Sequence, residues 1–496
     1  MNTLDSQAEH NVGSRQMAGM VLMGIVLSVI IRRLFFNPLA KIPGPWYTNW
    51  TDVILKIKTL KGIGPLYIDQ LHKQYGPVVR VGPNEVDVID IPTVKKIHRV
   101  KADFVKTDFY KGVPYGKENI VNTQDTDFHR RHRKLLSQAI SESSLKAMIP
   151  QIEEKVRLVI EKMGEEMKIR RAVDVYKWWM FMATDVIGQL TFGESFHALE
   201  KGKANTYIKD IRKAGLIASI GSQLSFLMPI LYYIPVPGLG HSYKALSDRL
   251  AMYATTQMKR LRDEMQSEDG DRPLLLSKLV RRATIEGETM TETELRNDAE
   301  AYIIAGSDTT SNTLTFLTWV LCGQPAIKDQ LIKELETLPL GFTDDDLKCL
   351  PFLNQCITEA LRRFPVIPIG LPRYVPKEGA DIAGYWLSGR TTVTTQAWSL
   401  HRNPEVFPDP DRYDPSRWEN PTKAMKDSII PFGGGSRICI GMHLAYIELR
   451  MGIAYFFQAF PNARVSTLEG MSDNDMVPAL HFLASPRSNR CLIEVS

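Results

Sequence analysis

The chain has 496 residues, enough for two or three domains or one large enzyme domain, and its hydrophobic fraction of 44% is ordinary for a globular protein. The net charge of +5 is scattered without a dense basic block, which argues against a nucleic-acid-binding protein. The cysteines form an odd set without Cys-x-x-Cys spacing, which argues against a disulfide framework or a zinc site and favours a reducing compartment: Cys322, Cys349, Cys356, Cys439 and Cys491.

An uncharged apolar run over residues 17–31 predicts a membrane anchor that extends to the aromatic residues ending at position 36. The run alone spans roughly 22 Å, so it crosses a bilayer core of roughly 30 Å only if Arg32 and Arg33 snorkel. A cleaved signal peptide is the alternative, but no small-residue cleavage site follows the run. Positive charges follow it, whereas Asp5 and Glu9 precede it, which predicts a main body on the cytosolic side.

After the N-terminal tail and anchor (residues 1–36), the chain is predicted to form one mixed domain over residues 47–496. Residues 37–46 are too rich in proline for a helix and form a stiff linker to it. Hairpins are predicted over residues 78–89 and 381–395. The other long elements are helical, which favours a mainly α fold with small β-sheets (α+β) over a βαβ array. The predicted helices cover residues 151–166, 207–220, 243–266, 291–322 and 442–457.

Two charge patterns precede the most informative motifs. The run from His129 to Arg133 has the pattern of a basic helix face. Glu359 and Arg362 are spaced to pair on one face of a helix, and their apolar flank distinguishes them from a surface pair.

The helix over residues 291–322 begins with a capping box formed by Thr291 and Glu294. Its apolar part is interrupted at residues 306–310 by a glycine, an aspartate and two threonines, and such a conflict with helix propensity is typical of a functional site. The Thr309 hydroxyl is expected to bond the Ala305 carbonyl, and Gly306 is expected to leave room for a ligand. A Ser/Thr-rich helix packed on a neighbour explains the segment equally well.

Near the C-terminus, a glycine-rich loop over residues 432–441 places Cys439 just before the predicted helix over residues 442–457. Free N–H groups at a helix N-terminus favour a thiolate, and Arg437 adds a positive charge. The loop is therefore a plausible mount for a metal cofactor held by one sulfur, although a buried structural cysteine is the commoner use of a lone thiol. A phosphate-binding loop is excluded because no Lys-Ser or Lys-Thr follows the glycines.

The whole loop, Phe-x-x-Gly-x-Arg-x-Cys-x-Gly, resembles the heme-binding loop of the cytochrome P-450 family, whose cysteine thiolate ligates the heme iron. The resemblance implies a bound heme b (iron protoporphyrin IX) with Cys439 as its metal ligand and Arg437 near a propionate. Phe432 is expected to pack against the heme on the thiolate side.

The other motifs resemble the same family in order and spacing, over residues 37–496. The resemblance implies that Asp308 and Thr309 deliver protons during oxygen activation. Arg133, Arg373 and, in place of a tryptophan common in the family, His129 are implied to contact the heme propionates. Arg417 would complete a buried network with Glu359 and Arg362, although Ser416 stands where glutamate is common.

These implications describe a membrane-bound monooxygenase that inserts one oxygen atom from dioxygen into an apolar small molecule. The chain has no Gly-x-Gly-x-x-Gly fingerprint, so its electrons are expected from NADPH through a separate flavoprotein reductase. The linker and His129 are similar to fungal microsomal members, which suggests secondary-metabolite tailoring at the endoplasmic reticulum membrane, with a single span and a cytosolic catalytic domain.

Three alternatives remain: a heme-thiolate isomerase or dehydratase without a reductase, a fatty-acid or xenobiotic hydroxylase, and a heme sensor. The pair Asp308-Thr309 argues against the first and the last of these. By the resemblance, the substrate pocket is expected at residues 109–115, 216–234, 366–371 and 476–480, although the same apolar residues also suit a core. Residues 224–234 are also candidates for contact with the membrane surface.

Overall fold

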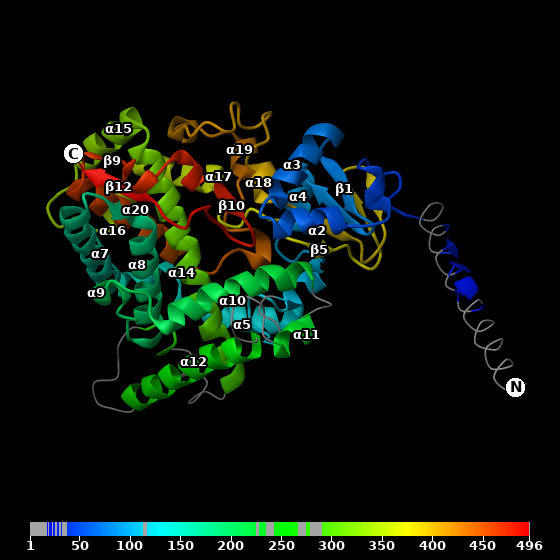
Figure 1. Ribbon diagram of the computed structural model, residues 1–496, viewed down its shortest axis with the longest axis horizontal. Coiled ribbons are helices and arrows are strands. Elements are labelled where there is room, and N and C mark those ends of the chain that lie inside the picture. Colours follow the sequence, from blue (N-terminus) through cyan, green and yellow to red (C-terminus); the bar gives the residue numbers. More distant parts are fainter. Residues whose placement is uncertain are drawn as a thin grey trace, which may run out of the picture.

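The computed structural model describes residues 37–112, 117–224, 228–234, 243–265, 274–277 and 290–495, with scattered positions between 17 and 31. Helices dominate this described part (Figure 1). The longer ones are α2 (Val53–Leu60), α3 (Gly64–Tyr75), α5 (Thr126–Ala139), α7 (Ile149–Arg170), α8 (Val175–Phe192), α10 (Thr206–Gln223), α12 (Tyr243–Met265), α14 (Glu292–Cys322), α15 (Pro325–Leu335), α17 (Pro351–Arg363) and α20 (Met442–Ala459). The shorter ones are α4 (Ile91–Ile97), α6 (Glu142–Lys146), α9 (Ala198–Lys201), α11 (Met228–Tyr233), α16 (Asp344–Lys348), α18 (Ala397–Leu400) and α19 (Lys423–Ser428).

The strands of the described residues form four small sheets, so the predicted α+β class is confirmed. The largest sheet has the order β1-β2-β8-β5-β3, and only the β2–β8 pairing in it is parallel. Its strands are β1 (Val78–Gly82), β2 (Glu85–Val88), β8 (Thr392–Thr394), β5 (Arg373–Tyr374) and β3 (Val105–Lys106). The other sheets are β4 (Val173–Asp174) with β12 (Leu492–Val495) and β9 (Ala463–Val465), β6 (Ala380–Ile382) with β7 (Tyr385–Leu387), and β10 (Pro478–Leu480) with β11 (Ala484–Pro486).

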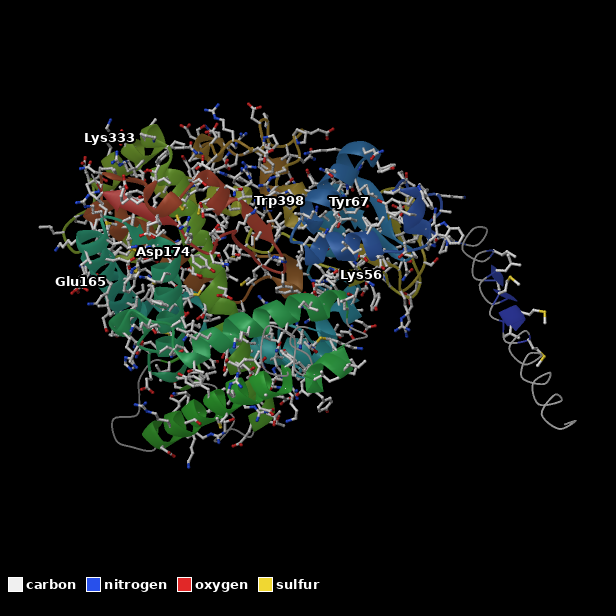
Figure 2. The ribbon with its side chains drawn as sticks, in the orientation of Figure 1. Lys56, Tyr67, Glu165, Asp174, Lys333 and Trp398 are labelled. Carbon is white, nitrogen blue, oxygen red and sulfur yellow. The ribbon has the colours of Figure 1, made fainter. Side chains whose placement is uncertain are left out.

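The molecule has a helical end and a strand-bearing end. Glu165 and Asp174 mark the helical end, whereas Lys56 and Tyr67 lie beside β1 and β2 at the strand-bearing end (Figure 2). The described segment from residue 37 onward begins at this second end (Figure 1). Between the two ends, α14 runs through the interior, with most of its side chains buried.

The closest helix packing in the core joins α14 to α8. A Cβ added at Gly306 would lie 2.9 Å from Cγ1 of Ile187 on α8, tighter than side chains tolerate. Farther along, the indole nitrogen of Trp179 donates to Oγ1 of Thr318 at 3.1 Å. Gly306 therefore makes room for α8, which corrects the expectation that it leaves space for a ligand.

The predicted long helices are confirmed, with small differences at their ends. The capping box is present, because the Thr291 hydroxyl accepts from the Glu294 N–H and the Glu294 carboxylate accepts from the Thr291 N–H. The helix predicted at residues 151–166 begins earlier, with a proline in its first turn, and ends before Arg171, whose φ of 64° is left-handed.

One predicted hairpin is confirmed and the other is wrong in extent. Strands β1 and β2 pair antiparallel, as expected for residues 78–89. In the second segment only β6 and β7 form a hairpin, across a turn at Gly384 with φ +86°. Strand β8 leaves it after Arg390, whose φ is 65°, and joins β2 and β5 instead. The left-handed residue redirects the chain, so one sequence run serves two sheets.

Most of the predicted anchor at residues 17–36 lies outside the described residues. Among the positions that the structure does describe, no helix combines the length and apolar character needed to cross a membrane.

Candidate functional site

The loop over residues 432–441 is held by its own backbone and by α4. The Cys439 N–H donates to the Phe432 carbonyl at 2.8 Å, which closes the loop before α20 begins. Gly435 has φ +59°, and a Cβ there would lie 1.9 Å from the carbonyl oxygen of His98, just after α4. That glycine is therefore required by contact with the protein's own backbone.

The Cys439 thiol is exposed, although its neighbourhood is dense. Burial raises the pKa of this thiol, while the Gly441 N–H and the Arg133 guanidinium act in the opposite direction. Gly441 is the N-cap of α20, so the predicted placement of the thiol at a helix N-terminus is confirmed. The helix terminus does not outweigh burial, however, so a stable thiolate needs a further cation at the sulfur.

Four cations gather near this loop: Lys106, Arg133, Arg373 and Arg437. The Nη1 atom of Arg437 is buried without a hydrogen-bond partner among the described residues. The pKa of Arg437 is lowered to about 10, chiefly by burial and also by Arg373. The pKa of Lys106 is lowered well below its usual value by burial and by these two arginines. Within the described chain, none of the four forms an ion pair with a carboxylate.

The protein holds these cations through neutral acceptors. Arg133 donates from Nη1 to the Ile438 carbonyl at 2.6 Å, and therefore touches the cysteine loop directly. Arg373 donates to the Tyr110 hydroxyl at 2.8 Å, and Lys106 lies 4.4 Å from the centre of the Tyr110 ring. None of these acceptors carries the negative charge that two buried cations, Lys106 and Arg373, and two half-buried ones, Arg133 and Arg437, require.

His129 lies buried beside this cluster. Its pKa is lowered to about 3, chiefly by burial and also by Arg437, Lys106 and Arg133, so its ring is neutral at physiological pH. The structure thus brings His129, Arg133, Arg373 and Arg437 together. Lys106 was missed by sequence reasoning, because a lone lysine in a two-residue strand carries no signal of its burial.

Helix α14 presents a second unusual surface. Ala305 is exposed although it lies in a core helix, and Tyr302, one turn earlier, has a buried hydroxyl without a partner. The Thr309 hydroxyl donates to the Ala305 carbonyl at 2.7 Å, as predicted, and the helix continues without a break. Asp308 precedes it, and its carbonyl accepts from the Asn312 side chain at 2.7 Å.

The predicted network around Glu359 is confirmed. Both Glu359 oxygens accept from Arg362 at 2.8 Å, and both side chains are fully buried. The Trp418 indole and the Asp414 N–H each add a bond of 2.9 Å. Arg417 lies 3.5 Å from Glu359, close enough for charge attraction but not for a hydrogen bond.

This network is joined to the cysteine loop through His401. Arg362 donates to the His401 carbonyl at 2.7 Å, and the His401 ring accepts at Nε2 from the Ile430 N–H at 2.9 Å. Ile430 lies just before Phe432, whose ring packs 5.3 Å from that of Tyr446. The network therefore supports the start of the loop.

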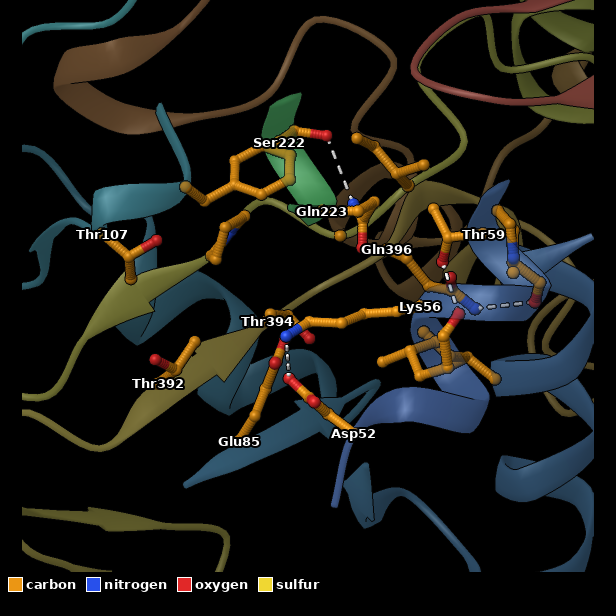
Figure 3. A pocket seen from close by; sticks show the side chains of 18 of the residues that line it. Asp52, Lys56, Thr59, Glu85, Thr107, Ser222, Gln223, Thr392, Thr394 and Gln396 are labelled. Atoms are coloured by element: carbon orange, nitrogen blue, oxygen red, sulfur yellow. Dashed lines mark hydrogen bonds and ion pairs between the residues drawn. The ribbon is translucent and has the colours of Figure 1, made fainter. Parts of the chain in front are cut away.

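A cavity of about 250 Å³ lies at the strand-bearing end (Figure 3). Three of the four predicted pocket segments contribute to it, through Phe109, Gln223 and Ile369. The fourth, residues 476–480, contributes no lining residue and includes β10. Residues 113–115 and 225–227 of the predicted pocket lie outside the described residues.

Together, these residues fit a flat metal cofactor with two acidic groups. The unpaired Arg437 nitrogen and the other buried cations lack an anion, and two propionates would supply it. The exposed Cys439 offers one sulfur ligand, and exposed Ala305 offers a small side chain on the core helix.

The chain is similar along most of its length to a known family of proteins. The family model described as Cytochrome P450 matches residues 42–490. Cytochrome P450 monooxygenase tazI of Aspergillus terreus is 41% identical over 484 residues, which cover 97% of this chain and 99% of the relative. Cytochrome P450 monooxygenase orf2 of Aspergillus niger is 37% identical, with 96% and 97% covered. Trichothecene C-15 hydroxylase of Fusarium sporotrichioides is 30% identical, with 87% and 89% covered.

Proposed function

Because this chain belongs to the cytochrome P450 family, we propose that it is a membrane-bound monooxygenase that tailors an apolar secondary metabolite of a fungus. The enzyme class follows from relatives that are named cytochrome P450 monooxygenases. One observation carries the assignment of the site: an exposed thiol, Cys439, lies beside a buried cation cluster that lacks an anion.

The proposed cofactor is heme b, with the Cys439 thiolate as the protein's ligand to iron. Bound heme supplies dioxygen activation, so that one oxygen atom enters the substrate and the other leaves as water. Arg437, Arg373 and Arg133 would hold the propionates by charge-assisted hydrogen bonds, with Lys106 adding positive charge. Buried neutral His129 lines the same side of the site, and Phe432 would pack on the thiolate side.

Asp308 and Thr309 are the proposed catalytic residues. The Thr309 hydroxyl donates its hydrogen to the Ala305 carbonyl. The lone pairs of its oxygen therefore remain able to accept a hydrogen bond from a proton donor. A turn of the hydroxyl then lets it donate from Oγ1 toward the exposed Ala305 surface. Asp308 would resupply the proton from solvent. This relay distinguishes an oxygenase from a heme-thiolate isomerase or dehydratase and from a heme sensor, since none of these consumes protons with dioxygen.

A membrane location is proposed from exposed apolar side chains at the strand-bearing end. Ile230 and Tyr233 on α11, Val53 and Ile57 on α2, and Trp46 are all exposed. Both helices lie in the half of the molecule where the described segment from residue 37 begins (Figure 1). With the apolar run at residues 17–36, this face suits a single span of the endoplasmic reticulum membrane and a cytosolic domain.

The proposed electron source is an NADPH-dependent flavoprotein reductase. Exposed Arg99 and Lys101 adjoin the cysteine loop, since the Lys101 N–H donates to the Ser436 hydroxyl at 3.0 Å. Exposed Arg130 and Lys134 lie on α5, the helix that also carries Arg133. This positive surface suits an acidic partner.

The decisive experiment has two parts. Reduced protein with carbon monoxide should give the absorption band of thiolate-ligated heme, and Cys439→Ser should abolish it. Expression with a reductase and candidate lipophilic substrates should then give an oxygenated product, identified by mass spectrometry. A rearranged or dehydrated product formed without reductase would favour the isomerase, and heme binding without any turnover would favour the sensor.

The relay has its own test. Thr309→Ala should keep the carbon monoxide band and most NADPH oxidation, while product formed per NADPH falls severalfold. Thr313→Ala, one turn later on α14, removes a similar hydroxyl-to-carbonyl bond and serves as a control. Unchanged coupling in Thr309→Ala would contradict the proposed role.

A further inference from the structure

The cavity of about 250 Å³ has an unusual polar wall. Asp52, Lys56 and Glu85 gather on this wall, while Ser222 and Gln223 lie across the cavity (Figure 3). Apolar side chains complete the lining, among them Leu55, Ile68, Phe109 and Ile369. The volume suits one or two rings, or one end of a longer lipophilic molecule.

One carboxylate on the polar wall has no hydrogen-bond donor among the described residues. The ammonium of Lys56 bonds Asp52 at 2.9 Å, whereas the side-chain carboxylate of Glu85 forms no hydrogen bond or ion pair with any described residue. The pKa of Glu85 is raised to about 7, chiefly by burial and also by the nearby carboxylates of Asp52 and Asp87, while Lys56 acts in the opposite direction. A half-buried carboxylate without a partner is costly, so this position favours a ligand that donates a hydrogen bond.

The cavity and the heme-binding cluster share one wall. Pro372 and Tyr374 line the cavity, and Arg373 between them belongs to the cation cluster. This is the alternation of side chains expected along a strand. Phe109 also lines the cavity, while its neighbour Tyr110 accepts the hydrogen bond from Arg373. A ligand in the cavity therefore lies one strand away from the groups that would hold heme.

We propose that this cavity binds the polar end of the substrate and selects a hydroxyl or phenol over a carboxylate, with Glu85 as the hydrogen-bond acceptor. The proposal rests on the proposed function only in naming the occupant as substrate. A carboxylate placed here would meet two carboxylates and one ammonium that is already paired. A hydroxyl can donate to Glu85 and accept from Lys56 or from a threonine hydroxyl.

Isothermal titration of the holoenzyme with 2-naphthol and 2-naphthoate tests this selection. At a pH about one unit above the Glu85 pKa, the wild type should bind 2-naphthol about tenfold tighter than 2-naphthoate, the effect of one favourable polar contact against one repulsion. Glu85→Gln should remove most of this preference, and Glu85→Lys should reverse it. Glu378→Lys makes the same change in net charge at an exposed loop position and should keep the wild-type ratio.

Two outcomes overturn the proposal: a wild-type ratio in both Glu85 variants, or a shift of equal size in Glu378→Lys. The glutamine side chain has nearly the same shape as glutamate. The affinity ratio of Glu85→Gln therefore tests the proposal even if Glu85→Lys folds poorly. The carbon monoxide spectrum is recorded on the same samples. A missing band there would contradict the oxygenase function, whereas the naphthol-to-naphthoate ratio would still report on Glu85.

Discussion

Two buried charge clusters adjoin the Cys439 loop, and they are built in opposite ways. Around Glu359, one carboxylate accepts hydrogen bonds from Arg362, Asp414 and Trp418, and Arg362 spends its remaining donors on backbone carbonyls. Around Arg437, four cations meet neutral acceptors and no carboxylate. In the first cluster, protein groups alone balance the buried charges. The second is complete only with an anionic ligand, which is how a binding site differs from a structural network.

This difference predicts that single substitutions in the two clusters change the stability of the apoprotein in opposite directions. Removing the anion from the first cluster leaves buried cations without a counter-charge and should destabilise the protein with or without heme. Removing a cation from the second relieves repulsion in the apoprotein and should weaken only the heme-bound state.

The largest effect is expected from Glu359→Gln. Breaking a buried ion pair typically costs about 3–5 kcal/mol, because the remaining charge stays buried without its partner. Urea unfolding of the apoprotein should therefore show a loss of about this size, or no soluble protein. Asp411→Asn is the control, since it removes a carboxylate that pairs with Arg363 and Arg402 but is 70% exposed, and it should cost about 1 kcal/mol or less. An unchanged unfolding midpoint in Glu359→Gln would contradict a stabilising role for the Glu359 network.

Arg437→Leu should act on the other cluster. The apoprotein should keep or gain stability, whereas heme should transfer to a heme-accepting globin at least about tenfold faster, since a charge-assisted bond is worth about 1.5–3 kcal/mol. Arg130→Leu, at a site 81% exposed on α5, makes the same change in net charge and should leave the transfer rate unchanged. A destabilised apoprotein with normal heme retention would show that Arg437 is structural.

The two clusters also differ in how far the sequence predicted them. Glu359 and Arg362 are three residues apart on one helix, so local spacing alone indicates their contact. Lys106, Arg133, Arg373 and Arg437 come from four distant segments that meet only through tertiary packing. Their roles were inferred by resemblance, and Lys106, which matches no motif, was missed.

The fold shows the same division between local and distant information. Helices with clear periodicity and caps, such as α14, were predicted to within a few residues. The run at residues 381–395 was read as one hairpin, because alternation does not show which strand a residue pairs with. The exchange of β8 to another sheet depends on a left-handed backbone at Arg390, a conformation that sequence rarely signals in a residue other than glycine.

The pH dependence of stability also distinguishes the two clusters, because each contains a neutral histidine. The expected effect is smaller than that of removing Arg437. The pKa of His401 is lowered to about 3, chiefly by burial and also by Arg362 and Arg402. His129 is lowered to the same value by burial and by the cation cluster. Both rings stay neutral in the folded chain but charge when unfolded, so their stabilising effect is complete above pH 6.5 and is lost as the pH falls toward 3.

The slope of the unfolding free energy against pH should change on heme binding through His129 but not through His401. Each such histidine contributes up to about 1.4 kcal/mol per pH unit below its unfolded pKa. His129→Gln should flatten the decline in apoprotein stability between about pH 6 and pH 4.5, and it should do so less in the holoprotein, where propionates offset the cations. Urea unfolding of both forms measures the two slopes. Equal flattening with and without heme would contradict an anion at this cluster.

Two buried tyrosines repeat the contrast at the smallest scale. The Tyr413 hydroxyl, near the Glu359 network, donates to the Cys356 carbonyl at 2.9 Å. The Tyr302 hydroxyl, near Arg133 and Cys439, has no hydrogen-bond partner in the part of the chain that the structure describes. Tyr413→Phe should therefore cost about 1 kcal/mol, whereas Tyr302→Phe should stabilise the apoprotein by about 1 kcal/mol, because an unpaired buried hydroxyl costs free energy.

In the holoprotein, Tyr302→Phe should be destabilising instead of stabilising if the heme, or a water ordered by it, accepts a hydrogen bond from the Tyr302 hydroxyl. The effect of Tyr413→Phe should not change. Unfolding midpoints of the apoprotein and heme-transfer rates of the holoprotein measure the two effects on the same pair of variants. A loss of apoprotein stability in Tyr302→Phe equal to that in Tyr413→Phe would mean that the hydroxyl is already satisfied within the protein. The site around α14 would then be complete without a ligand, and the difference between the two clusters would rest on Arg437 alone.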